Sequence, residues 1–189
     1  HQIDSDYRGF SFQKNTTLDM RMNTQQNLAA ENIINNYSEK ELTNVLRIYS
    51  EDKYYKKISK RIIESRPIST TSDLVNLIKD AIPKQNPIFI EKTIRRIFQA
   101  LRIEVNNELD EIKNSLISMN NSINNKGVIV CISYHSLEDR IVKNYFKDIT
   151  TECICEPSIP ICKCDIEQQF KYSKKKKFTP SDKEKEINP

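Results

Sequence analysis

The sequence has very little glycine and no tryptophan: Gly9 and Gly127 are the two glycines among 189 residues. A phosphate-binding loop needs several closely spaced glycines, so that the backbone can approach the phosphates. The two glycines are too far apart to form such a loop. The sequence also has no run of 18 apolar residues. We therefore expect no transmembrane helix and no membrane partner, and nucleotide binding would need residues outside the chain.

The first ten residues, "HQIDSDYRGF", lack a starting Met and the basic and apolar regions of a signal peptide. Nothing in the chain argues for secretion, so we expect a cytoplasmic protein whose five cysteines are reduced. The formal charge of +4, from 30 Lys and Arg against 26 Asp and Glu, is mild. The location of the cations therefore matters more than their total.

Apolar residues recur at helical spacing through the first two thirds of the chain. Four helices are predicted over residues 25–35, 38–49, 53–65 and 70–82. Ser38 with Glu41, and Thr70 with Asp73, have the spacing of N-terminal caps. A fifth apolar stripe runs from Ile94 to Ile123 without a break, which predicts one helix of about eight turns.

One stretch, "GVIVCISYHSLEDR" at 127–140, differs from the helical pattern. Its apolar run at 128–132 does not alternate, which is typical of a parallel strand buried on both faces. A helix is predicted after it, from Leu137 to about Phe146, and residues 170–178 could supply a neighbouring strand. We therefore predict an α/β fold, a fragment of a doubly wound sheet with a helical insertion, whose other strands lie outside the chain.

Ligands of open α/β sheets bind at the carboxyl ends of the strands, which places residues 133–140 at the predicted site. Ser136 with Asp139 fits a capping box for the following helix. His135 precedes that cap on the crevice side, and Arg140 follows it, so both are candidate catalytic residues. The alternative for Arg140 is a structural pair with a carboxylate.

Residues 53–66 hold six cations against the single acid Glu64. The candidate RNA-binding residues on the predicted helix are Lys53, Lys56, Lys57, Lys60 and Arg61, interleaved with Tyr54 and Tyr55. Such a face can neutralise phosphates. The alternative is an ordinary solvated helix surface, and a different RNA footprint would then lie around Arg95, Arg96 and Arg102.

Four of the cysteines form two close pairs: Cys153-x-Cys155 and Cys162-x-Cys164. The pairs could bind Zn²⁺, although the usual spacing is C-x2-C. The alternative is a reduced loop bent by proline, and no metal is required by the predicted chemistry. We expect Cys131, which lies within the predicted strand, to fill the core.

Three long motifs occur in order: "RGFSFQKNTTLDMRMN" at 8–23, "FQALRIEVNNEL" at 98–109 and "ISYHSLEDRIVKNYF" at 132–146. Together with "FTPSDKEKEINP" at 178–189, they resemble the bacterial 16S ribosomal RNA cytosine-N4 methyltransferase family. The resemblance covers essentially the whole chain. The sequence departs from the family at His1, where Pro is usual, and at 92–95.

The resemblance implies S-adenosylmethionine-dependent methylation of a cytidine at the decoding centre, with the small ribosomal subunit as partner. It implies a Rossmann-like methyltransferase sheet interrupted by a helical domain that recognises substrate. Segments 1–23 and 101–189 would then belong to the methyltransferase domain, and 24–100 to the insertion. Gln2 matches a residue that contacts the cofactor, and the ring of Tyr134 is a candidate to hold the target base.

A second hypothesis is a stand-alone helical module, centred on residues 24–124, that binds RNA or protein without catalysis. The predicted strand at 128–132 favours the methyltransferase, because a helical module does not need it. We leave the formation of a homodimer open.

Overall fold

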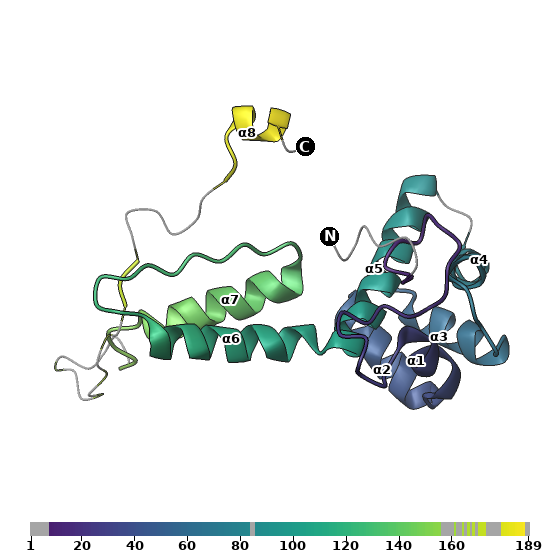
Figure 1. Ribbon diagram of the computed structural model, residues 1–189, viewed down its shortest axis with the longest axis horizontal. Coiled ribbons are helices and arrows are strands. Elements are labelled where there is room, and N and C mark those ends of the chain that lie inside the picture. The colour runs from purple at the N-terminus through teal and green to yellow at the C-terminus, as the bar shows by residue number, and fades with distance from the viewer. Residues whose placement is uncertain are drawn as a thin grey trace. The chain divides into compact units, whose positions relative to one another are not determined.

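The computed structural model describes residues 8–83, 86–155, 161, 164, 166, 168, 170–172 and 179–187. Figure 1 labels the helices that these residues form. They are α1 (Ala30–Asn36), α2 (Glu39–Ser50), α3 (Tyr55–Glu64), α4 (Thr71–Ala81), α5 (Pro87–Asn106), α6 (Glu108–Ser122), α7 (Ser136–Ile149) and α8 (Asp182–Ile187). Internal contacts divide the chain into two compact units, residues 1–114 and 115–189. The assignment of three segments to two domains stays a prediction.

The predicted α/β fold with a Rossmann-like sheet is wrong for the residues that the structure describes. Those residues contain no strand, and their β-type pairing is one isolated antiparallel bridge between Thr17 and Thr70. Val128, Val130 and Ile132 of the apolar run are 79%, 75% and 80% exposed. A strand requires a neighbour that supplies ladder hydrogen bonds, and an apolar composition does not provide one.

The proposed neighbouring strand at 170–178 is described only at Phe170, Lys171 and Tyr172. There the amide of Phe170 donates a hydrogen bond to the carbonyl of Ile149, with N and O 3.3 Å apart. This part of the chain therefore returns to the C-terminal end of α7 and does not pair with residues 128–132 at that position.

The first unit has one apolar core, which α1 to α5 enclose (Figure 1). Each helix contributes side chains that are almost fully buried: Ile33, Ile34, Leu42, Leu46, Ile58, Ile62, Leu74, Ile78, Ile97 and Leu101. Burying one such side chain contributes about 1.5–3 kcal/mol relative to exposure. The apolar side of each of these helices is therefore buried within this unit.

Residues 8–29 contain no helix, yet they are fixed on this core. Leu18 and Met20 are each 1% exposed and pack among the helices. Gly9 has φ +71, and a Cβ placed on it would lie 2.3 Å from the carbonyl oxygen of Thr17. Only glycine permits both this backbone conformation and this close approach, so Gly9 serves the packing of the segment.

The two predicted helix caps are confirmed. The Glu41 amide donates to Ser38 Oγ over 3.3 Å, and the Glu41 carboxylate accepts from the Ser38 amide over 2.8 Å, which completes a capping box at the start of α2. The Asp73 amide donates to Thr70 Oγ1 over 3.2 Å at the start of α4. Each cap stabilises its helix by about 1 kcal/mol.

The single long helix predicted over 94–123 is divided in the structure. α5 ends at Asn106, and Asn107 adopts the left-handed conformation with φ 50 before α6 begins. Asn106 also holds the N-terminal segment, because its side chain donates to the Met20 carbonyl and accepts from the Met22 amide, over 2.8 and 2.7 Å. Asparagine tolerates the left-handed region. The spacing of apolar residues carries no sign of a single residue in that conformation, so the break at Asn107 was not predicted.

In the second unit α7 lies alongside α6 (Figure 1), and the hydroxyl of Tyr145 donates to the carbonyl of Leu116 over 3.0 Å. Leu116 and Leu137 are buried. The helices formed by the described residues include none that is long and apolar enough to cross a membrane.

Candidate nucleic-acid interface

A buried carboxylate fixes the start of α3, the helix that carries the predicted RNA-binding cations. Asp52 is 6% exposed, and its Oδ1 accepts a hydrogen bond from the Tyr54 amide over 2.9 Å. Its Oδ2 accepts from the Thr93 hydroxyl over 3.0 Å and lies 3.6 Å from Nη1 of Arg96. Asp52 therefore ties the beginning of α3 to α5, which sets the orientation of the helix on the core.

The two sides of α3 are distinct. Ile58 and Ile62 are completely buried, and the buried hydroxyl of Ser59 lies 2.7 Å from that of Thr43 in α2. The five candidate side chains, of which Lys53 precedes the helix, are all exposed: Lys53, Lys56, Lys57, Lys60 and Arg61. We call these five residues the α3 cationic face.

The face is only partly neutralised. Lys60 Nζ lies 3.8 Å from a carboxylate oxygen of Glu64, and both side chains are well exposed, so this pair contributes little. The ammonium groups of Lys53 and Lys56 lie over the rings of the tyrosines beside them, 4.9 and 6.0 Å from the ring centroids. Among the described residues, no carboxylate lies within 4.0 Å of the cationic groups of Lys56, Lys57 or Arg61.

Arg66, the sixth cation of the stretch, is not part of this face. Its guanidinium is partly buried and donates to the carbonyl of Ile34 and, over 2.7 Å, to that of Tyr37. Burial lowers the pKa of Arg66 below its usual value. This side chain therefore joins the end of α3 to α1, a role that composition alone did not indicate.

The alternative footprint on α5 is already paired with carboxylates. The N–O distances are 2.6 Å for Arg95 with Glu91, 3.6 Å for Arg96 with Asp52, and 2.7 Å for Arg102 with Glu108. The side chains of Asp52 and Glu108 are largely buried, so the carboxylates that hold Arg96 and Arg102 reduce the attraction of these two arginines for phosphate, whereas the pair of Arg95 with Glu91 is exposed. The geometry therefore favours the α3 cationic face over the α5 arginines as a surface for nucleic acid.

At the start of α7, the predicted cap is wrong. The N-cap is His135, not Ser136, and the ring Nδ1 of His135 accepts from the Glu138 amide over 3.4 Å. A carboxylate oxygen of Glu138 in turn accepts from the Tyr134 amide over 2.7 Å. The other ring nitrogen lies 3.2 Å from Glu138 Oε1 but is not aligned for a hydrogen bond. His135 thus has a structural role that sequence reasoning assigned to its neighbour.

The remaining candidates are dispersed or fall outside the described residues. The side chain of Tyr134 is 89% exposed, and Arg140 is exposed on α7. Cys153, Cys155 and Cys164 come together after α7. Gln2, the predicted cofactor residue, and Cys162 lie outside the described residues.

A groove that the sequence did not indicate lies between α2 and α5, with a volume of about 230 Å³. Its lining includes Tyr37, Glu41, Tyr49 and Glu104. The Tyr37 hydroxyl donates to Glu104 Oε1 over 2.9 Å, and burial together with this carboxylate raises the pKa of Tyr37 to about 12. Tyr37 and Glu104 are 67 positions apart in the sequence, so only tertiary packing brings the lining of the groove together.

The described residues contain no glycine that could let a nucleotide-like cofactor approach the backbone. Both glycines are used in internal packing: Gly9 faces the carbonyl of Thr17, and a Cβ on Gly127 would lie 2.3 Å from the side chain of Ile123. Neither glycine therefore leaves backbone open to a phosphate or a sugar. We derive no catalytic step through a cofactor from these residues.

An exposed cationic face with adjacent tyrosines, on a compact helical unit, is typical of proteins that bind nucleic acid. Comparison with known proteins gives a narrower result. The chain belongs to the MraW methylase family, whose family model matches residues 1–189. The resemblance to the methyltransferase family is thereby confirmed, and it favours that hypothesis over the helical module without catalysis. A methylase requires a methyl donor.

Curated relatives named "Ribosomal RNA small subunit methyltransferase H" are similar to the whole chain. The protein of Clostridioides difficile (strain 630) is 45% identical over 192 residues, and that of Clostridium botulinum (strain Kyoto / Type A2) is 46% identical over 193. The protein of Caldicellulosiruptor saccharolyticus is 44% identical over 190 residues. The chain spans 62%, 62% and 61% of the lengths of these relatives.

Proposed function

We propose that the protein carrying this chain methylates N4 of a cytidine in 16S ribosomal RNA at the decoding centre, with S-adenosyl-L-methionine as methyl donor. The observation that carries the proposal is about 45% identity along the entire chain to proteins named as small-subunit ribosomal RNA methyltransferases. A ribosomal RNA substrate would place the enzyme in the cytoplasm, in contact with the small subunit.

The role proposed for the helical unit is to bind RNA through the α3 cationic face. Lys56, Lys57 and Arg61 are exposed cations without a carboxylate within 4.0 Å among the described residues. Contacts of this kind position a protein on the phosphate backbone and carry no sequence information of their own. They would hold the RNA while another part of the site selects the cytidine.

The chemistry of the proposed reaction requires mainly positioning. The exocyclic amine of cytosine is a poor nucleophile, because its lone pair is delocalised into the ring, so it must be held in line with the methyl group. The base also has to leave its stack to be reached. The exposed ring of Tyr134 is suited to stack on such a base.

The direct test is an assay of the complete gene product with small-subunit ribosomal RNA and S-adenosylmethionine carrying an isotopic label in its methyl group. We expect labelled N4-methylcytidine in the digested RNA. Label in another nucleoside would contradict the assigned position, and absence of label in the RNA would contradict the proposed activity.

His135 and Arg140 stay proposed as catalytic residues, and the cap geometry gives a test that separates catalysis from folding for His135. His135→Asn keeps a good N-cap residue, whereas His135→Ala removes the cap at a cost of about 1 kcal/mol. If His135 takes part in the reaction, both variants lose turnover, and the Asn variant keeps its unfolding midpoint. Full turnover in the Asn variant would restrict His135 to capping.

A further inference from the structure

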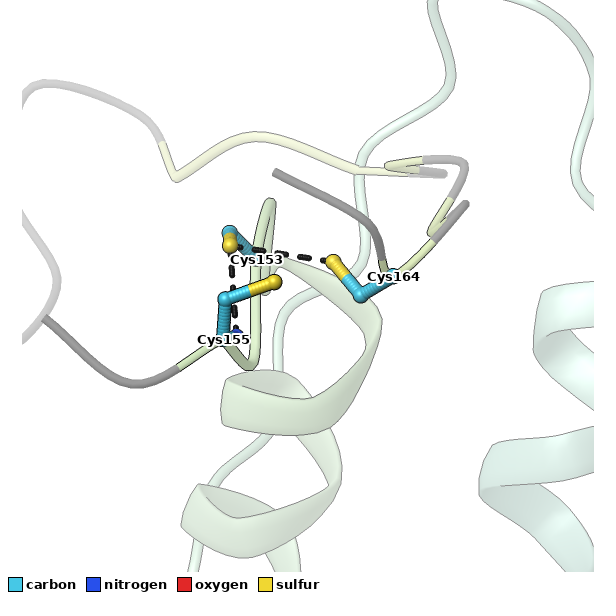
Figure 2. Close-up of side chains that lie close together, drawn as sticks. All are labelled: Cys153, Cys155 and Cys164. Carbon is cyan, nitrogen blue, oxygen red and sulfur yellow. Dashed lines mark hydrogen bonds between the residues drawn. The ribbon is translucent and has the colours of Figure 1, made fainter. Parts of the chain in front are cut away.

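Three thiols meet just beyond α7, two from residues that are two positions apart and the third from nine positions later. Cys153 and Cys155 follow the end of that helix, and Cys164 approaches them from later in the chain (Figure 2). Their sulfur atoms all lie within 4.8 Å of one another. Cys164 Sγ is 3.7 Å from Cys153 Sγ, which Figure 2 marks with a dashed line.

The distance between the sulfur atoms of Cys153 and Cys164 agrees with that of two ligands around one metal ion. Zn²⁺ binds thiolate sulfur at about 2.3 Å in tetrahedral sites, so two sulfur ligands of one ion are about 3.8 Å apart. A disulfide bond would require about 2.05 Å between the sulfurs. The observed 3.7 Å between Cys153 and Cys164 matches the tetrahedral edge.

The backbone around the cluster is organised to hold it. The Cys155 amide points at Cys153 Sγ, 3.3 Å away, and a donor of this kind stabilises a thiolate. Beyond Cys164, the side-chain amide of Gln168 donates to the Thr150 carbonyl over 3.0 Å. The two chain segments that supply the thiols are therefore already held together at the end of α7.

We propose that Cys153, Cys155 and Cys164 are ligands of a structural Zn²⁺ ion that fastens the segment after α7 to the segment that returns to it. Thiolates select soft and borderline cations over Mg²⁺ and Ca²⁺. Each thiol gives up its proton to the solvent as it binds, so affinity falls as the pH is lowered. Cys162 lies outside the described residues, and we assign the fourth ligand to no residue.

The test is metal titration of the 189-residue chain, stripped with a chelator and kept under a thiol-free reductant. Co²⁺ should bind with a stoichiometry of one and give thiolate-to-cobalt charge-transfer absorption, and Zn²⁺ should displace it. Cys153→Ser, Cys155→Ser and Cys164→Ser should each lower the affinity by more than about 100-fold, beyond the loss typical of an outer-shell change. Cys131→Ser is the matched control, because its thiol is not in the cluster, and it should bind like the parent chain.

Three results would overturn the proposal: absence of the charge-transfer band, serine variants that bind like the parent chain, or an equal loss in Cys131→Ser. If a serine variant does not fold, X-ray absorption of the Zn²⁺-loaded parent chain decides. The proposal requires a sulfur shell at about 2.3 Å, and a shell of nitrogen and oxygen alone contradicts it.

Discussion

The triple replacement Lys56→Gln, Lys57→Gln and Arg61→Gln would test the α3 cationic face quantitatively. It removes three exposed cations that no carboxylate neutralises among the described residues. Each phosphate contact contributes about 0.7 to the salt-dependence slope on single-stranded RNA and about 0.9 on a duplex. The slope of log K against log salt should therefore be shallower by about 2 to 3 units, since three contacts are lost. Over a fourfold rise in salt, the parent chain should lose about 20- to 40-fold more affinity than the variant.

Fluorescence anisotropy of labelled small-subunit ribosomal RNA, titrated with each protein across a salt series, measures this slope. The control is Lys40→Gln, Lys79→Gln and Lys92→Gln, which removes the same charge from exposed positions on α2, α4 and α5. The control should keep the slope of the parent chain. An unchanged slope in the α3 variant, or an equal change in the control, would refute the assignment of phosphate contacts to α3.

Three further outcomes follow from the packing and the pKa shifts. Ile58→Ala should lower the free energy of unfolding in urea by about 2–5 kcal/mol, because Ile58 is fully buried; a loss below 1 kcal/mol would contradict the core described. The pKa of Tyr37 is raised to about 12, so the stabilisation from its protonated hydroxyl is present below pH about 10 and is lost as the pH rises towards 12. In an ultraviolet titration, Tyr37→Phe should remove a tyrosine that ionises late, and a titration curve without that change would contradict this. The hydrogen bonds of Arg21 lower the pKa of Asp19. In Asp19→Asn the free energy of unfolding should therefore fall less steeply as the pH drops below about 4, and an unchanged pH dependence in that range would argue against this ion pair.

Local rules predicted the caps of α2 and α4 correctly, because a cap depends on residues within one turn. Ser38 with Glu41, and Thr70 with Asp73, form their hydrogen bonds between residues three positions apart, so no distant part of the chain is needed. The orientation of α3 was also predictable. Ile58 and Ile62, four residues apart, lie on one side of a helix and determine which residues are exposed.

The features that failed depend on contacts that are not local. The apolar run at 128–132 was interpreted as a buried strand, although burial on both faces requires partners that the run itself does not specify. Arg66 was counted in the charge excess of residues 53–66, because nothing in the neighbouring sequence shows that its guanidinium donates to the carbonyls of Ile34 and Tyr37. His135 was placed outside the cap because serine is the commoner N-cap residue, whereas the ring of His135 supplies the acceptor.

The proposed contact of α3 with small-subunit ribosomal RNA is tested most directly by ultraviolet crosslinking, followed by mass spectrometry of the linked peptides. Tyr54 and Tyr55 are half-buried beside the α3 cationic face, with the ammonium groups of Lys53 and Lys56 over their rings. We expect residues 53–61 to contribute a major crosslinked peptide, which the Lys56→Gln, Lys57→Gln and Arg61→Gln variant loses. Crosslinks confined to other segments, and equally strong in that variant, would contradict it.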